Sequence, residues 1–128
     1  MGTMKNGIIN IRVFGVLDTI ARKNSLKYKD WAEKAWGHPK YQSRISELKR
    51  KLSEPDEKVG RAFTIEKCFD LLNGLKESLG GELVTREMKK MLNKAKTQRE
   101  RAILLVLAAD DKEVESLIPI LEAVVLRN

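Results

Sequence analysis

Apolar residues recur at intervals of three and four over most of the chain, and this spacing predicts a series of amphipathic α-helices. The first helix is expected from about residue 8 to 23, after Asn6-Gly7 and before Asn24-Ser25. Its inward positions are Ile8, Ile11, Val13, Phe14, Leu17, Ile20 and Ala21.

A second and a third helix are expected on either side of a tight turn at Gly37-His38-Pro39. The second runs from about Tyr28 to Trp36, and glycine is common just past the end of a helix. Proline then prevents the helix from continuing, so the third helix spans about Lys40 to Leu52. One face of this third helix is polar and basic, and the other carries Ile45, Leu48 and Leu52.

A turn at residues 53–56 and a polar loop as far as Gly60 lead to a fourth helix. Thr64 is expected to be its N-cap, and Gly80-Gly81 to end it. Its expected inward residues are Ile65, Cys68, Phe69, Leu72 and Leu75.

Thr85 is expected to cap a long helix whose character changes along its length. Its first part is basic, at Arg86, Lys89, Lys90, Lys94 and Lys96. Its second part, residues 103–109, is apolar on nearly every side, which is typical of a helix buried on all sides. A buried strand over residues 103–107 is the alternative, because short apolar runs fit both structures.

The last helix is expected to begin at a cap made by Asp110 and Glu113. Pro119 falls inside it, and this residue either kinks the helix or marks a later start.

The composition is that of a globular protein large enough to bury a core without disulfides or metal. The chain has 128 residues, 34% of them charged, and the single Cys68 suits a reducing compartment. No signal peptide is evident, and the longest apolar run, Ala102 to Ala109, is far shorter than a membrane span. We therefore expect a cytoplasmic protein without membrane contact.

The net charge of +7 is unevenly distributed. Residues 1–61 carry 14 Lys/Arg and 7 Asp/Glu, whereas residues 62–128 carry 11 of each. The whole net charge therefore belongs to the half that contains the second and third helices, as a phosphate-binding surface requires.

Three stretches between about residues 12 and 79 resemble the Cro/phage-repressor (Xre-type) helix-turn-helix family. Leu26, Trp31 and Ala32 take the Leu, Leu and Ala places of the motif that enters the family's second helix. Ile45-Ser46-Glu47-Leu48 fits the pattern of its recognition helix, and residues 64–75 fit its fourth helix. The sequence departs from the family at Tyr28, where a Gln is common, and in a longer connection between the second and third helices.

The resemblance implies an all-α fold, a four-helix lambda-repressor-like bundle over residues 1–81, with residues 82–128 as a helical extension. It also implies that the third helix enters the DNA major groove. The candidates for reading bases are Gln42, Ser43, Arg44, Ser46 and Glu47. The candidates for binding phosphates are Lys27, Tyr28, Lys29, Lys40, Lys49, Arg50, Lys51, Lys58 and Arg61.

Members of that family usually bind palindromic sites as two-fold dimers, and the apolar extension is the expected dimerisation region. The candidate residues are Ile103, Val106, Leu107, Leu117, Leu121, Val124 and Val125. The alternative is that these residues pack under the first four helices as part of one enlarged core.

Enzymatic chemistry has little support in the sequence. The only histidine, His38, lies in a turn, Cys68 has no partner, and no glycine-rich loop follows a strand, so no metal or cofactor is expected. We expect a double-stranded DNA binder, a phage- or prophage-type repressor that acts as a homodimer. The alternatives are the antitoxin of a toxin–antitoxin pair, whose C-terminal helices hold a toxin, and a helical adaptor for an acidic protein.

Overall fold

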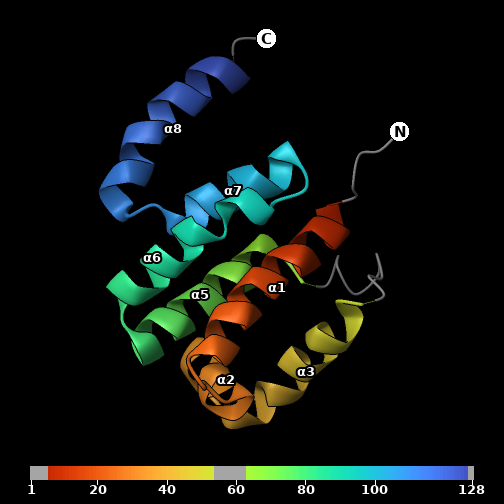
Figure 1. Ribbon diagram of the computed structural model, residues 1–128. Helices are drawn as coiled ribbons and strands as arrows, with labels where there is room; N and C mark the ends of the chain where they lie inside the picture. Colours follow the sequence, from red (N-terminus) through yellow and green to blue (C-terminus); the bar gives the residue numbers. More distant parts are fainter. Residues whose placement is uncertain (1–5, 54–62, 127–128) are drawn as a thin grey trace.

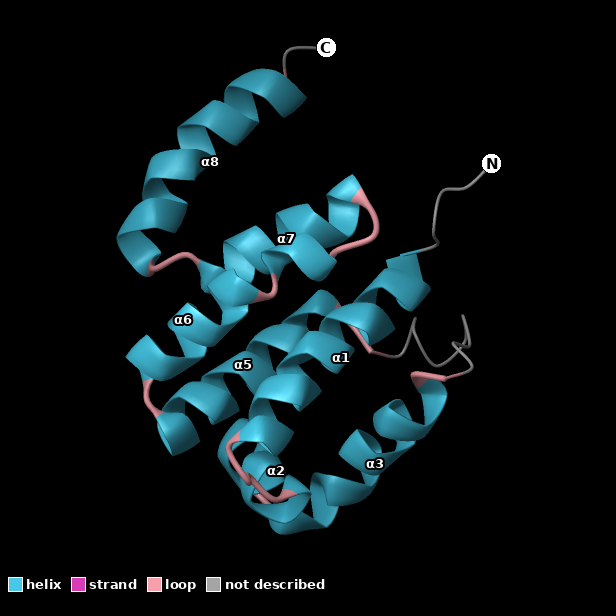
Figure 2. Cartoon of the chain, viewed as in Figure 1, coloured by secondary structure: helices cyan, strands magenta, loops and turns pink. Residues whose placement is uncertain are grey.

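Helices account for most of the chain that the structure describes (Figures 1 and 2). The structure is a computed structural model that describes residues 6–53 and 63–126. Its elements are α1 (Asn6–Lys23), α2 (Tyr28–Trp36), the 3-10 helix η1 (Pro39–Tyr41), α3 (Gln42–Lys51), α5 (Ile65–Leu79), α6 (Gly81–Lys90), the 3-10 helix η2 (Leu92–Lys94), α7 (Gln98–Ala108) and α8 (Asp111–Val125). These residues include no strand, so the all-α prediction is confirmed and the strand alternative at residues 103–107 is excluded.

Several helix ends lie where the sequence predicts them. Gly37 follows α2 in the left-handed conformation, at φ +84°, and its N–H donates to the carbonyl of Glu33. The hydroxyl of Thr64 accepts from the backbone N–H of Lys67 at the start of α5. Asp110 and Glu113 form the predicted reciprocal cap of α8, with hydrogen bonds of 2.8 and 3.0 Å.

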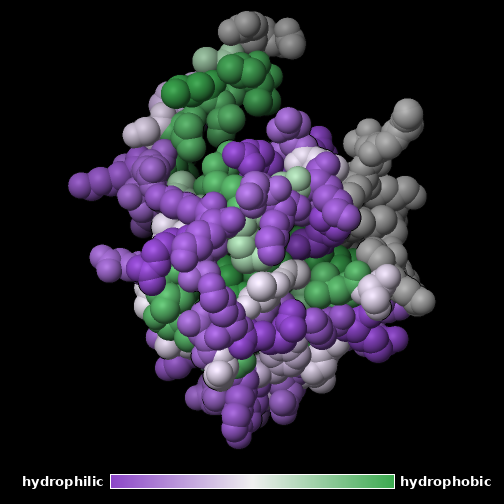
Figure 3. All heavy atoms as spheres, in the orientation of Figure 1, coloured by the Kyte–Doolittle hydropathy of each residue, from purple (hydrophilic) through white to green (hydrophobic). Residues whose placement is uncertain are grey.

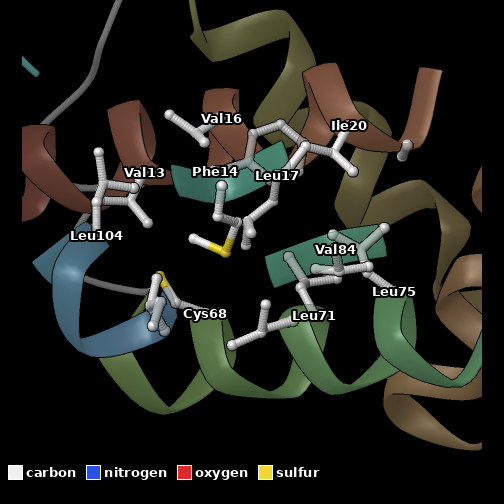
Figure 4. Packing of buried hydrophobic residues seen from close by; sticks show 14 of the residues in the cluster. Val13, Phe14, Val16, Leu17, Ile20, Cys68, Leu71, Leu75, Val84 and Leu104 are labelled. Atoms are coloured by element: carbon white, nitrogen blue, oxygen red, sulfur yellow. The ribbon is translucent and has the colours of Figure 1, made fainter. Parts of the chain in front are cut away.

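A single hydrophobic cluster joins α1, α2, α3, α5, α6 and α7, and Figure 4 shows its centre. The ring of Phe14 stacks on that of Trp31, with 6.0 Å between centroids. Val84, Met88, Leu104 and Leu107, from the second half of the chain, are buried in the same cluster. The core therefore continues across residue 81, where the sequence suggested a domain boundary.

The helices α2 and α5 approach closely because α5 carries a glycine at the contact. A Cβ on Gly74 would lie 3.0 Å from the backbone nitrogen of Ala35 and 3.1 Å from Cδ1 of Trp31. The indole N–H of Trp31 donates to the carbonyl of Leu71, at 2.8 Å, and this bond fixes the register of the two helices.

The predicted long helix from Thr85 is wrong. Thr85 lies inside α6, which ends at Lys90, and a new helix starts after Thr97. The hydroxyl of Thr97 accepts from the backbone N–H of Glu100, so this threonine is the true N-cap of α7. Residues 91–97, which include η2, connect the two helices, and α7 packs against α1.

The predicted inward face of α5 also needs correction. Ile65 and Phe69 are each 37% exposed, whereas Leu71 is fully buried. The helix buries the face formed by Cys68, Leu71, Leu72 and Leu75, whose spacing of three, one and three follows the helical repeat. In α7, similarly, Leu105 is 47% exposed, so residues 103–109 are not buried on every side.

The last helix, α8, extends away from the other helices (Figure 1). Pro119 lies within it and does not delay its start. Large apolar side chains remain exposed along it, and they form the hydrophobic surface over α8 in Figure 3. They are Leu117, Ile118, Ile120, Leu121, Val124, Val125 and Leu126.

Candidate nucleic-acid interface

A five-residue connection, 37–41, carries the chain from α2 to α3. After Gly37, the imidazole Nδ1 of His38 accepts from the backbone N–H of Lys40 at 3.0 Å. Pro39 then begins the single 3-10 turn that leads into α3. The connection is longer than the three to four residues usual in a helix-turn-helix, in agreement with the longer spacing in the sequence.

The helix α3 has one buried and one exposed side. Ile45 and Leu48 pack into the core, while Gln42, Ser43, Arg44 and Ser46 are exposed and Glu47 is half-buried. At about 100° per residue, the exposed side is centred on Ser43, Ser46, Glu47 and Arg50, with Gln42 and Arg44 at its two edges. We call the five predicted base-reading residues, Gln42, Ser43, Arg44, Ser46 and Glu47, the α3 face.

Aromatic side chains orient Arg44 at one edge of the α3 face. Its guanidinium carbon lies 4.5 Å from the centroid of the Tyr41 ring, within cation–π range. That ring meets Trp36 edge-on, with 6.3 Å between centroids, so Tyr41 packs against Trp36. Trp36 is fixed in turn by a hydrogen bond of 3.1 Å from its indole N–H to Asp70. The stacking favours one guanidinium orientation before any ligand is bound.

A shallow hollow of about 440 Å³ lies beside this aromatic group. Residues of α2, α3 and α5 line it, together with Phe63, which precedes α5. The lining residues are Trp36, Ser43, Arg44, Glu47, Leu48, Phe63 and Lys67. The α3 face is therefore flanked by a concave edge.

An ion pair joins Glu47 and Arg50 on the exposed side of α3. The hydrogen bond from Arg50 lowers the pKa of the Glu47 carboxyl, which therefore stays ionised at neutral pH. A carboxylate on a reading helix can accept from the amino group of cytosine.

A fully buried carboxylate, Asp18 of α1, connects three helices. It accepts from the hydroxyl of Tyr28 at 2.6 Å and from Nε of Arg22 at 2.9 Å, and Nζ of Lys49 lies 3.3 Å away. Burial, reinforced by the hydrogen bond to Asp18, raises the pKa of the Tyr28 hydroxyl well above its ordinary value. Tyr28 and Lys49 thus use, in contacts within the protein, the same groups that the sequence assigned to phosphate binding.

The other phosphate candidates are distributed around α2 and α3. Lys27, Lys29, Lys40 and Arg50 are exposed, and Lys51 is half-buried. Lys58 and Arg61 lie outside the described residues.

The candidate dimer residues divide between two helices. Leu117, Leu121, Val124 and Val125 are exposed on α8, Ile103 and Val106 are half-buried on α7, and Leu107 is 1% exposed. Leu107 is therefore a core residue, because α7 packs it against the first helices, and it must be removed from the candidate interface.

Sequence reasoning missed two buried carboxylates, Asp18 and Glu100. Glu100 is 2% exposed and accepts from Nε of Arg12 at 2.9 Å, which attaches α7 to α1. Asp18 gives one sequence signal, a carboxylate within the apolar run Val16-Leu17-Asp18-Thr19-Ile20. Glu100 also gives a signal, because it stands three residues after Thr97, which is the spacing of the cap predicted from Asp110 and Glu113.

Among the described residues, no three His, Cys, Asp or Glu side chains are arranged to hold a metal ion. Cys68 is fully buried, and burial raises the pKa of its thiol to about 12, which suppresses the reactive thiolate.

No family model, curated protein or solved structure matches the chain. Within residues 6–53 and 63–126, no helix has the length and apolar character needed to cross a membrane.

Proposed function

We propose that the chain binds double-stranded DNA in a sequence-specific manner through the α3 face, as a phage- or prophage-type transcriptional repressor. The observation that carries the proposal is the two-sided character of α3. Its apolar side is fixed in the core by Ile45 and Leu48, while its other side exposes amide, hydroxyl and guanidinium groups to solvent.

The chemistry of the α3 face suits base edges in a major groove. The amide of Gln42 can bond adenine N6 and N7, and the guanidinium of Arg44 can bond guanine O6 and N7. The ion pair between Lys49 and Asp18 supports the same function, because it holds α3 rigidly against α1. Exposed cations at Lys27, Lys29 and Lys40 are available for flanking phosphates.

We further propose that two copies assemble through α8. Val114, Leu117, Leu121 and Val124 follow the three-four-three spacing of a coiled-coil seam, and Leu121 is 52% exposed in a single chain. Residues 110–126 carry five carboxylates and one lysine, so two parallel copies would place like charges together. An antiparallel arrangement separates the acidic first turns and aligns opposite ends of the helix dipoles.

A second candidate function rests on the same exposed helix. In an antitoxin, α8 would hold a toxin in place of another copy of this chain. The two functions differ in what the purified complex contains, a second copy or a different protein.

The test is selection of bound duplexes from a random pool at near-physiological salt, combined with the mass of the complex. An enriched inverted repeat bound by two chains is the expected result. Binding without enrichment of any sequence would contradict the proposal, and a single chain on one half-site would contradict the dimer.

A further inference from the structure

The connection between α6 and α7 carries a second concentration of positive charge, far from the α3 face in the sequence. Residues 94–101 include four exposed cations, Lys94, Lys96, Arg99 and Arg101. We call these four residues the connection surface. They are held within one short segment that runs from η2 through the cap residue Thr97 into the first turn of α7.

The one carboxylate in this segment is bound by groups other than the amino groups of Lys94 and Lys96. Glu100 is buried, and its Oε2 accepts from Nε of Arg12 and from the backbone N–H of Lys96. Among the described residues, no carboxylate lies within 4.0 Å of the amino group of Lys94 or Lys96. The positive charge of Lys94 and Lys96 therefore faces solvent, as a surface that binds anions requires.

The nature of the anion follows from what surrounds the connection surface. No aromatic residue occurs after Phe69, so the segment has no platform on which unpaired bases could stack. No large apolar side chain is exposed between Phe69 and Leu105, so the segment lacks the apolar side chains that insert into a membrane surface. The phosphate backbone of a duplex fits both observations.

The connection surface and α3 are attached to different sides of α1. Arg12 fixes α7 through Glu100, and Asp18 fixes α3 through Lys49. Arg12 and Asp18 are six positions apart in this helix, which places them about 120° apart around the axis of α1. Figure 1 likewise shows α7 and α3 on opposite sides of α1.

We propose that the connection surface is a second phosphate-binding site, which binds the backbone of a stretch of duplex DNA other than the one at the α3 face. The inference depends on the proposed function only for the identity of its ligand. Sequence-independent binding at this site would add affinity without adding specificity.

The test compares two variants that each remove two positive charges, Lys94→Gln/Lys96→Gln and the control Lys76→Gln/Lys112→Gln. Binding of a labelled duplex of arbitrary sequence, about four helical turns long, is measured by fluorescence anisotropy over a range of salt concentrations. Each phosphate that a cation neutralises contributes about 0.9 to the slope of log affinity against log salt. The first variant should therefore flatten the slope by about two, and the control should leave it unchanged.

Equal slopes for the two variants would overturn the proposal. Loss of binding to vesicles containing phosphatidylserine, or to single-stranded oligo-dT, with duplex binding unchanged, would also overturn it. Selection of bound duplexes from the random pool, repeated with Arg44→Ala, separates the two proposals. If Lys94→Gln/Lys96→Gln flattens the slope while Arg44→Ala leaves the sequence preference unchanged, phosphate binding by the connection surface is supported and base reading by the α3 face is contradicted.

Discussion

Nζ of Lys49 lies 3.3 Å from Oδ2 of Asp18, so a cation on α3 is bound to a fully buried carboxylate on α1. The same carboxylate accepts from Tyr28 at the start of α2. One charged group therefore joins three helices, in addition to the core packing of Ile45 and Leu48. This arrangement gives the α3 face a fixed position without any contribution from its exposed residues.

Asp18→Asn should lower the free energy of unfolding by about 1–3 kcal/mol, because it removes the acceptor charge while Lys49 and Arg22 remain. Both cations are partly exposed and can turn to water, which limits the loss. Urea denaturation measures it, with the exposed Asp30→Asn as the control. An effect no larger than that of the control would contradict the structural role of Asp18.

Two glycine substitutions should have different effects on stability. Gly74→Ala forces a Cβ against the backbone of Ala35, and we expect the free energy of unfolding to fall by about 1–3 kcal/mol. Gly15→Ala meets only the end of the Leu52 side chain, at 3.1 Å, which can move. Because alanine favours a helix over glycine by about 1 kcal/mol, Gly15→Ala should be neutral or stabilising. Equal thermal shifts for the two variants would contradict the close approach of α2 and α5.

The thiol of Cys68 should react slowly in the folded protein. Its pKa is raised from the ordinary 9.0 to about 12 by burial, so almost no thiolate forms at a mildly alkaline pH. The rate of modification by a disulfide reagent should increase by orders of magnitude when the protein is unfolded in guanidinium chloride. Similar rates in the two conditions would mean that the core around α5 opens readily.

Gln42→Ala and Arg44→Ala should each reduce the preference for the selected duplex over a variant at one base pair. The expected loss of discrimination is about 1–3 kcal/mol for each bidentate pairing removed. Lys27→Ala, at the start of α2, should instead weaken binding to all sequences alike. Competition binding with single-base-pair variants measures both effects, and the reverse pattern would assign base reading to another element.

Leu121→Asp should convert the dimer to a monomer, because it places a charge in the middle of the proposed seam on α8. The matched control is Ser116→Asp, which adds the same charge to the same helix away from the seam. Sedimentation velocity at micromolar concentration distinguishes the two species. If Leu121→Asp remains dimeric, another surface joins the chains.

Local signals in the sequence predicted the helices and several of their ends. Gly37, Thr64 and Asp110 all act as predicted, since a cap depends on residues within one helical turn. The break before α7 also has a local signal, in Thr97 and Glu100. It was missed because apolar residues continue at helical spacing on both sides of the break.

The choice of inward face required the tertiary structure. Both Phe69 and Leu71 are apolar and lie on α5, and only the approach of α1 and α2 decides which is buried. The partners of Asp18 and Glu100 were equally inaccessible to sequence reasoning. Arg12 and Glu100 are 88 residues apart, so no local pattern connects them. For the same reason, nothing in the sequence indicated that Lys49 would be turned toward Asp18.

Pro119 makes α8 a poor helix on its own. It has no N–H to donate to the carbonyl of Glu115, and a proline within a helix costs about 3 kcal/mol. A fifteen-residue helix in water is marginal even without that loss. In the proposed dimer, formation of the α8 helix is therefore coupled to association of the two chains. The fraction of α8 that is helical then depends on the protein concentration. At low concentration α8 is unfolded and sensitive to proteases, and at high concentration it forms the dimer interface.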